Sequence, residues 1–268
     1  MNHFRIAHKS SAFHKKQGGF SIVELLIAGV LGLLLLGGVL QLFLGSNQNY
    51  TMQDELATIQ EDGRFALMFL GDQIEMAGWS DPTANEVRPA IDFLNSADGA
   101  NNDTIALTYV RANDGVNNID CNGNVVLGGI VTNQFSVNNN NELVCRGMGV
   151  GGTAQPLVAD VESFQVLYGV ETERVCPDGL VDRYMTRQEV NNAGLVNNVL
   201  AVRIALLLRS DNEILPENKA EQFQVLDQAF NFNDRSMRRL FQKTIPMPNS
   251  AFNILTNSDE TIKCMSGF

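Results

Sequence analysis

Histidine is scarce in this sequence, and its placement is uneven. The three histidines are His3, His8 and His14, so no histidine follows residue 14. Histidine is the usual general base near neutral pH and the most common metal ligand. A chain that loses residues 1–19 could therefore run neither a Ser-His-Asp nor a Cys-His mechanism, and it could not build a histidine-based zinc site.

Cysteine is also sparse, and its spacing excludes the common thiol motifs. Cys121, Cys145, Cys176 and Cys264 form no CxxC pair, which argues against a zinc knuckle or a thioredoxin-like site. An even count beyond an apolar N-terminal segment indicates two disulfides in an oxidising compartment. Three pairings are possible. We expect Cys121–Cys145, which flank a predicted hairpin, and Cys176–Cys264, which would hold the C-terminus. Reduced, buried thiols are the alternative.

Positive charge is in short supply, with 19 Lys and Arg against 30 Asp and Glu and a formal net charge of −11. Four basic residues lie within residues 1–19, so a chain without them keeps 15 and has a net charge of −15. An acidic body repels phosphates, so we expect no direct binding of nucleic acid. The acids are scattered, and no spacing singles out a catalytic carboxylate pair. We therefore predict no enzyme and no cofactor.

A long apolar run is what the sequence does contain. Residues 20–44 read FSIVELLIAGVLGLLLLGGVLQLFL, with Glu24 as the only charge. As a helix this run would measure about 37 Å, enough to cross a bilayer core of about 30 Å. Lys15 and Lys16 precede it and, by the positive-inside rule, stay in the cytoplasm. The sequence therefore predicts a single-pass membrane protein with a cytoplasmic N-terminus, whose remaining chain lies on the other side of the membrane.

Two other interpretations of this run fit less well. A secretory signal peptide has a shorter apolar region that ends at a small-residue cleavage site, and no such site closes residues 20–44. A plain membrane anchor does not explain Glu24, because an acidic side chain inside an apolar span costs a few kcal/mol without a partner.

The segment from Lys15 to Glu24, KKQGGFSIVE, resembles the class III leader of type IV pilins and type II secretion pseudopilins. This resemblance implies that prepilin peptidase cuts between Gly19 and Phe20 and then methylates the new N-terminal Phe20. It also implies that Glu24 pairs with the terminal amine of a neighbouring subunit. Opposite charges couple strongly where the dielectric is low, so the pair would set the register of assembly. Pairing of Glu24 with its own N-terminus is the alternative.

Beyond the apolar run, apolar residues recur every three or four positions, which is the period of an amphipathic helix. They are Leu56, Ile59, Gly63, Ala66, Leu70, Ile74 and Ala77, and Gly78 and Pro82 then end the pattern. We predict a cleaved leader over 1–19, a transmembrane and assembly helix over 20–45, an amphipathic continuation over 46–78 and a β-rich head over 79–268. The fold class is α+β, type IV pilin-like, with the long helix packed on an antiparallel sheet.

Strand patterns fill the predicted head. Residues 104–110 and 125–131 are rich in β-branched and aromatic residues, and an asparagine-rich turn over 138–141 predicts a hairpin. The segments QPLVADVESFQVLYGV (155–170), DRY (182–184) and VRIALLLRS (202–210) resemble the PilW family of minor pilins. Their alternation predicts adjacent central strands.

Two polar segments are more ambiguous. Glu171, Glu173, Asp178 and Asp182 are weak candidates for a calcium loop, because calcium needs six to eight oxygens and Arg174 intrudes; a solvated turn is the alternative. Residues 237–245, MRRLFQKTI, predict a late strand with a basic face. That face would contact an acidic neighbour or simply protect a sheet edge.

The resemblance implies a minor pilin that joins a priming or tip complex and supports pilus biogenesis and twitching motility. Its partners would be other minor pilins, the major pilin, prepilin peptidase, the inner-membrane assembly platform and a tip adhesin. It would finish in the pilus at the cell surface. A J-type pseudopilin of type II secretion is the alternative function, and a membrane-tethered binding module is a further one.

Overall fold

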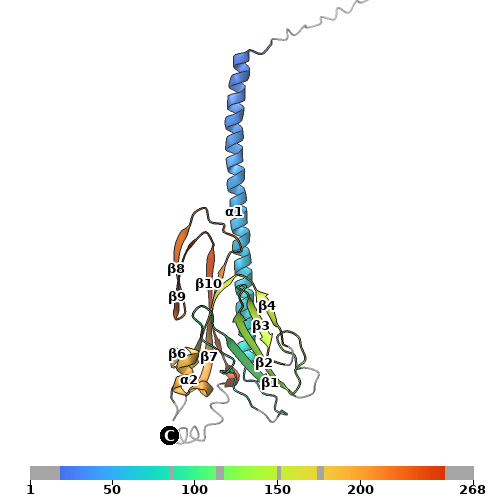
Figure 1. The fold of residues 1–268 in the computed structure, drawn as a ribbon, viewed down its shortest axis with the longest axis vertical. Coiled ribbons are helices and arrows are strands. Elements are labelled where there is room, and N and C mark those ends of the chain that lie inside the picture. Colours follow the sequence, from blue (N-terminus) through green and yellow to red (C-terminus); the bar gives the residue numbers. More distant parts are fainter. Residues whose placement is uncertain (1–18, 85–86, 113–117, 150–151, 174–177, 251–268) are drawn as a thin grey trace, which may run out of the picture. The chain divides into compact units, whose positions relative to one another are not determined.

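The computed structural model describes residues 19–84, 87–112, 118–149, 152–173 and 178–250. The chain divides into two units, residues 1–50 and residues 51–268, and helix α1 (Ile22–Met76) has residues in both. The second unit holds all the strands (Figure 1). It is called the head below.

The head half of α1 buries the predicted apolar stripe. Its buried residues are Ile59, Gly63, Ala66, Leu70, Gly71 and Ile74. At Gly63 an added Cβ would overlap the ring of Phe241, so the absence of a side chain lets this ring lie directly on the helix. The helix ends at Met76, and the turn that follows includes Gly78, whose φ of 79° favours glycine because other residues meet steric strain there.

The first sheet has the strand order β1-β2-β3-β4, all antiparallel. Its strands are β1 (Ile105–Val110), β2 (Ile130–Val137), β3 (Leu143–Gly147) and β4 (Ala154–Val158). The asparagine turn joins β2 to β3 as predicted, and Asn141 adopts a left-handed φ of 59° there. Asparagine tolerates this conformation better than most residues.

The predicted strand over 125–131 is wrong for residues 125–129, and only Ile130 and Val131 lie in a strand. The strand of this region begins only at Ile130, because Gly128 and Gly129 have φ values of 96° and 80° that break an extended chain. Apolar composition alone did not reveal this interruption, since Val125, Val126 and Leu127 have high β propensity.

The second sheet has the strand order β10-β7-β5-β6. Its strands are β5 (Val161–Val170), β6 (Arg183–Met185), β7 (Val199–Arg209) and β10 (Arg238–Pro246). β5 and β7 pair antiparallel, with Val166 opposite Ile204, so the predicted central strands are adjacent. The segment 155–170, predicted as one strand, is two strands in different sheets. Asp160 turns the chain between them with a φ of 56°.

The remaining elements cover the second sheet. The hairpin of β8 (Lys219–Val225) and β9 (Gln228–Asp234) forms its own two-stranded sheet, and its phenylalanines pack on Ala205 and Leu207 of β7. The short helices α2 (Arg187–Ala193) and η1 (Val196–Asn198) lie between β6 and β7 in the sequence. A capping box of Thr186 and Glu189 begins α2.

One large core joins α1 to both sheets. Leu70 and Ile74 of α1, Phe135 of β2, and Phe164 and Leu206 of the second sheet all belong to it and are fully buried. Each such side chain stabilises the fold by about 1.5–3 kcal/mol through burial. The predicted α+β fold class, a long apolar N-terminal helix followed by a head of antiparallel sheets, is confirmed.

Candidate functional site

The candidate assembly site is the N-terminal end of α1. Gly19 and Phe20 lie before the first residue of the helix, and Phe20 is 84% exposed. Ser21 accepts a hydrogen bond on its hydroxyl from the Val23 N–H (3.3 Å) and one on its carbonyl from the Leu25 N–H (3.1 Å). Ser21 therefore occupies the N-cap position, and the Gly19–Phe20 peptide bond lies outside the helix.

Glu24 lies in the first turn of α1. A carboxylate there is favoured by the partial positive charge of the helix N-terminus. Ser21 and Glu24 have the S-x-x-E spacing of a capping box, which is a signal in the sequence for the start of this helix. The position suits Glu24 for contact with an amine near the start of the helix, because Phe20 is only one residue before the cap.

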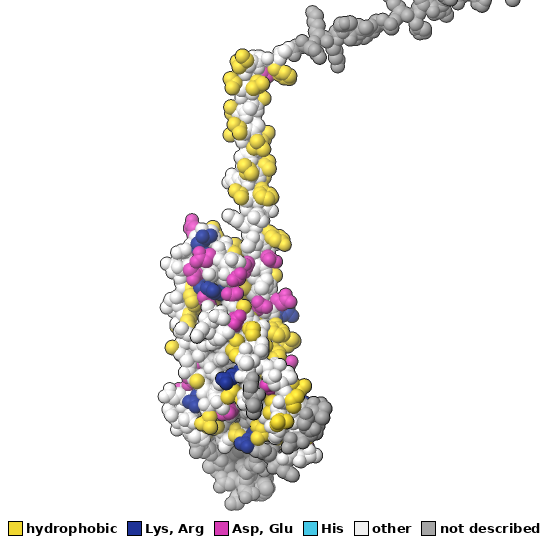
Figure 2. Space-filling view, turned by 45° about the vertical axis from the view of Figure 1, so that its right-hand side comes forward, with side chains coloured by type: hydrophobic (Ala, Val, Ile, Leu, Met, Phe, Trp, Pro, Cys, Tyr) yellow, Lys and Arg dark blue, Asp and Glu magenta, His cyan; other side chains and the backbone are white. Residues whose placement is uncertain are grey.

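The apolar half of α1 is uncovered. From Phe20 to Leu44 its large apolar side chains are between 55% and 84% exposed, and Figure 2 shows hydrophobic side chains along this part of the helix. By length and composition α1 includes a stretch able to cross a membrane. A soluble monomer rarely exposes so continuous an apolar surface, so lipid or other helices must cover it.

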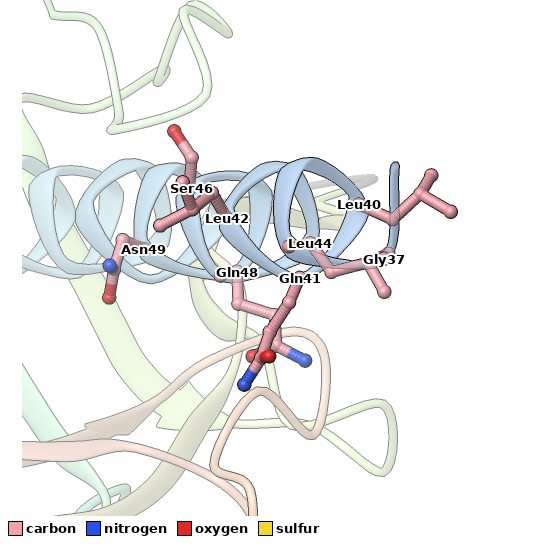
Figure 3. Close-up of a pocket in the computed structure, with 10 residues that line it drawn as sticks. Gly37, Leu40, Gln41, Leu42, Leu44, Ser46, Gln48 and Asn49 are labelled. Carbon is pink, nitrogen blue, oxygen red and sulfur yellow. The ribbon is translucent and has the colours of Figure 1, made fainter. Parts of the chain in front are cut away.

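A hollow on this half of α1 marks where the apolar stretch gives way to polar residues. Gly37, Gly38 and Gly45 contribute no side chain to its lining. Figure 3 shows Gln41 and Gln48 extending from the same side of the helix. Small residues let another helix approach closely in lipid, and amide side chains can bond across such a contact.

The predicted disulfide between Cys121 and Cys145 is present, with Cα atoms 6.3 Å apart. Cys145 is in β3 and is fully buried, so the bond fastens the loop before β2 to the first sheet. Cys121 also donates its backbone N–H to Asn133 Oδ1 (3.0 Å). The other predicted pair, Cys176–Cys264, lies outside the described residues.

The carboxylates proposed as calcium ligands accept hydrogen bonds from residues of their own loop. Asp182 Oδ2 accepts hydrogen bonds from the Thr172 N–H (2.7 Å) and hydroxyl (2.6 Å). Glu171 is buried and accepts one from the Gly179 N–H (2.7 Å). Burial raises the pKa of Glu171, and the Asp178 and Asp182 carboxylates add to the rise. Within the described ranges no three metal-ligating side chains come together.

A second acidic group lies on the head. Burial raises the pKa of Asp160, and Asp211 and Glu55 raise it further by repulsion. Burial likewise raises the pKa of Asp62, with Asp160 among the charges that add to it. These carboxylates come from α1, the β4–β5 turn and the loop after β7. Figure 2 shows Asp and Glu side chains gathered on one part of the head, which disfavours contact with nucleic acid phosphates.

The prediction of a basic face on residues 237–245 is partly wrong, because the side chain of Arg238 is buried and does not contribute to an exposed face. Its side chain is 2% exposed and pairs with Glu162 of β5 and Asp234 of β9. Its guanidinium carbon also lies 3.8 Å from the centre of the Phe232 ring. Arg239 and Lys243 are the exposed basic residues of β10. Two adjacent arginines in a strand point to opposite sides, and the sequence did not reveal which one faces inward.

Comparison with known protein families supports the predicted resemblance to the PilW family. Residues 131–249 match the family model of PilW, the type IV pilus-assembly protein W. The head is PilW-like. The matched region runs from β2 past the end of β10 and includes both central strands of the second sheet, so the predicted resemblance to the PilW family is confirmed there.

The PilW-like chain was also compared with curated sequences and solved structures. No curated protein matches it in sequence. Among solved structures, the type IV-like pilin TTHA1219 from Thermus thermophilus aligns with a TM-score of 0.45 and 14% identity, covering 74% of this chain and 96% of that chain.

Proposed function

We propose that this chain is a minor pilin of a type IV pilus. It is made as a precursor with residues 1–19 as leader, cut between Gly19 and Phe20 by prepilin peptidase, and N-methylated at Phe20. Before assembly into the pilus it lies in the inner membrane as a single-pass protein with a cytoplasmic N-terminus and a periplasmic head. Its role is structural: with other minor pilins it primes the filament, stays at or near the tip and supports twitching motility.

The observation that carries this proposal is the PilW match of residues 131–249, in a chain whose uncovered apolar helix starts just after Gly19 and Phe20. The apolar half of α1 provides the surface for packing with neighbouring subunits, first in lipid and then in the filament. The PilW match favours the pilus over a type II secretion system, since the leader and the helix serve both.

The test is the intact mass and N-terminal sequence of the protein extracted from membranes. We expect a chain that begins at Phe20 and carries one added methyl group. In cells that lack prepilin peptidase the same protein should begin at Met1. A chain that keeps residues 1–19 in peptidase-positive cells, or that is cut beyond Leu44, would overturn the proposal. Deleting the gene should abolish surface pili and leave protein secretion unchanged; the reverse result would favour the secretion system.

A further inference from the structure

The two four-stranded sheets protect their edges unequally. Residues 78–81 and 90–97 cover the outer edge of β1: the Thr108 N–H bonds to the Ala90 carbonyl (2.9 Å) and the Val110 N–H to the Trp79 carbonyl (2.8 Å). Edge strands that are left open are sites for pairing with another chain, and proteins normally block them.

Two other edges carry specific blocking devices. The outer strand β4 is five residues long and has Pro156 at its centre, which removes one donor. The edge of β5 away from β7 is sealed by side chains: Asn102 Oδ1 accepts from the Phe164 N–H, and Asp103 Oδ2 accepts from the Val166 N–H, both at 2.8 Å. Beyond these residues β6, only three residues long, completes that edge.

The outer edge of β10 has no such cover among the described residues. β10 pairs with β7 alone, and the ladder bonds at its two ends run from Ser210 N–H to the Met237 carbonyl and from Met247 N–H to the Leu200 carbonyl. Bonded and outward-facing residues alternate in an antiparallel pair, and the register between these ends has no shift. The backbone groups of Leu240, Gln242 and Thr244 therefore point outward.

The side chains along this edge are exposed. Leu240 is 36% exposed, and Gln242 and Thr244 are also exposed. They lie on one face of β10, where Thr244 Oγ1 accepts from Arg203 Nε (3.0 Å). Arg239 and Lys243 lie on the other face and are exposed as well. A strand added here would thus meet Arg239 and Lys243 on one face. On the other face it would meet Leu240, Gln242 and Thr244, with Arg203 of the neighbouring strand β7 bonded to Thr244.

We infer that the outer edge of β10 binds an extended segment of a different protein subunit, one that carries acidic side chains on one face and apolar side chains on the other. The segment would add a fifth strand to the second sheet. This inference rests on the proposed function, because it assigns the partner contact of the head to β10.

A second copy of this chain is a poor occupant. In an antiparallel pair of two β10 strands, Arg239 or Lys243 of one copy falls opposite or diagonal to Arg239 or Lys243 of the other, and like charges across a strand pair are destabilising. Arg239 and Lys243 therefore disfavour pairing with β10 of a second copy and favour pairing with a strand that carries acidic side chains.

The experiment measures binding of a synthetic peptide to the detergent-solubilised chain by fluorescence anisotropy. The probe has nine residues, like β10, and alternates Glu with Val. We expect saturable binding to the wild type. Gln242→Pro removes an outward N–H and keeps the ladder to β7, so it should weaken binding by about tenfold, the effect of one lost hydrogen bond. Gln242→Ala keeps that N–H and should weaken it by no more than about threefold.

Controls separate this result from nonspecific adhesion and from the proposed function. A peptide with Lys in place of Glu should not bind, and the thermal midpoint of Gln242→Pro should stay close to that of the wild type. Absence of binding to the wild type, equal binding of the Lys peptide, or equal binding by Gln242→Pro would overturn the inference. A large fall in the midpoint of Gln242→Pro would also overturn it, because the Gln242 N–H would then take part in the fold of this chain and would not be free for a partner. None of these outcomes depends on leader cleavage at Gly19.

Discussion

Asp103 shows how one side chain can replace a missing strand. Its two carboxylate oxygens accept the N–H groups of Gly99 (2.9 Å) and Val166 (2.8 Å), and the residue is 4% exposed. Burial raises its pKa from 3.8 to about 6, although both hydrogen bonds oppose the rise. The charged form is therefore disfavoured in the folded protein relative to the unfolded chain.

This pKa predicts how the stability of the head depends on pH. A carboxyl group whose pKa is raised by folding contributes stability that is fully present below its unfolded value near 3.8 and lost as pH rises through about 6. In Asp103→Asn this dependence disappears. We therefore expect the unfolding free energy of the wild type, measured relative to that of Asp103→Asn, to rise by roughly 2 kcal/mol from pH 7 to pH 4. Denaturant unfolding at several pH values measures it.

The matched control for this prediction is Asp72→Asn, an exposed carboxylate of α1. Its unfolding free energy should follow the wild type across the same pH range. If Asp103→Asn follows the wild type equally well, the Asp103 carboxyl does not change its proton affinity on folding and the prediction is contradicted.

Gly63 allows a second test at the scale of one residue. Alanine in place of glycine normally stabilises a helix by up to about 1 kcal/mol. At Gly63, however, the new methyl group would overlap the Phe241 ring, and overpacking costs about 1–3 kcal/mol. We expect Gly63→Ala to lower the unfolding free energy by about 1–2 kcal/mol in chemical denaturation.

A comparison variant separates packing from helix propensity. In Gly71→Ala the methyl group would meet only the terminal Nζ of Lys243, at 2.9 Å, and a lysine terminus can move aside. This variant should be neutral or stabilising. Equal effects of Gly63→Ala and Gly71→Ala would contradict the close approach of Phe241 to α1.

At the scale of elements, Arg238 joins three strands. Its Nη2 atom lies 2.9 Å from Glu162 Oε1 of β5 and 2.6 Å from Asp234 Oδ2 of β9, while Arg238 itself begins β10. Burial alone would lower the pKa of Arg238, but Asp234 and Glu162 outweigh it and raise that pKa. In return, the hydrogen bonds from Arg238 lower the pKa of Asp234.

Removing this guanidinium should weaken the attachment of the β8–β9 hairpin to the second sheet, although the phenylalanines of the hairpin still pack on β7. We expect Arg238→Leu to lower the unfolding free energy by roughly 3 kcal/mol at pH 7, because it leaves two carboxylates without their partner. The lowered pKa of Asp234 means that its contribution is present above its unfolded value near 3.8 and lost as pH falls through the folded value. The effect should therefore shrink below about pH 4. Unfolding curves at pH 7 and pH 3 measure both statements.

Arg239→Leu is the neighbouring control, since Arg239 is exposed and a surface change of this kind typically stays within about 0.5 kcal/mol. A similar loss of stability in Arg239→Leu and Arg238→Leu would mean that the ion pairs do not join β5, β9 and β10 as the structure has them.

The elements also show what the sequence could reveal. The stripe from Ile59 to Ile74 could be predicted because burial on one face of a helix imposes a period. Strands β5 and β7 are buried on both faces, and their β-branched and aromatic residues made them predictable. The break at Asp160 could not be predicted, since one residue of low strand propensity does not by itself end a strand and only pairing with β3 or with β7 divides residues 155–170 between two sheets. The cap at Ser21 was readable from its spacing to Glu24. The edge-sealing role of Asp103 was not, because it depends on a contact with Val166 far along the chain.

At the scale of the whole molecule, one charged residue stands in a helix that is otherwise apolar for its first turns. Glu24 is in the first turn of α1, and the large apolar side chains around it are exposed. When subunits or lipid cover those side chains, the carboxylate enters a medium where an unpaired charge is costly. A terminal amine at Phe20, created by cleavage of the leader, would neutralise it. The local benefit of an acid at a helix N-terminus is smaller, about 0.3–1 kcal/mol.

These two roles of Glu24 predict different outcomes for Glu24→Ala. If the residue only favours the helix start, the variant should assemble nearly as well as the wild type. If it pairs with the amine of a neighbour, the variant should be cut at Gly19 and inserted normally, yet surface pili should fall to the level of the gene deletion. We expect the second result, because buried opposite charges couple far more strongly than a helix dipole.

Mass spectrometry measures processing, and electron microscopy counts pili. Ser21→Ala, which removes the cap and keeps the charge, should retain most pili. Normal piliation of Glu24→Ala would exclude the pairing as the basis of register.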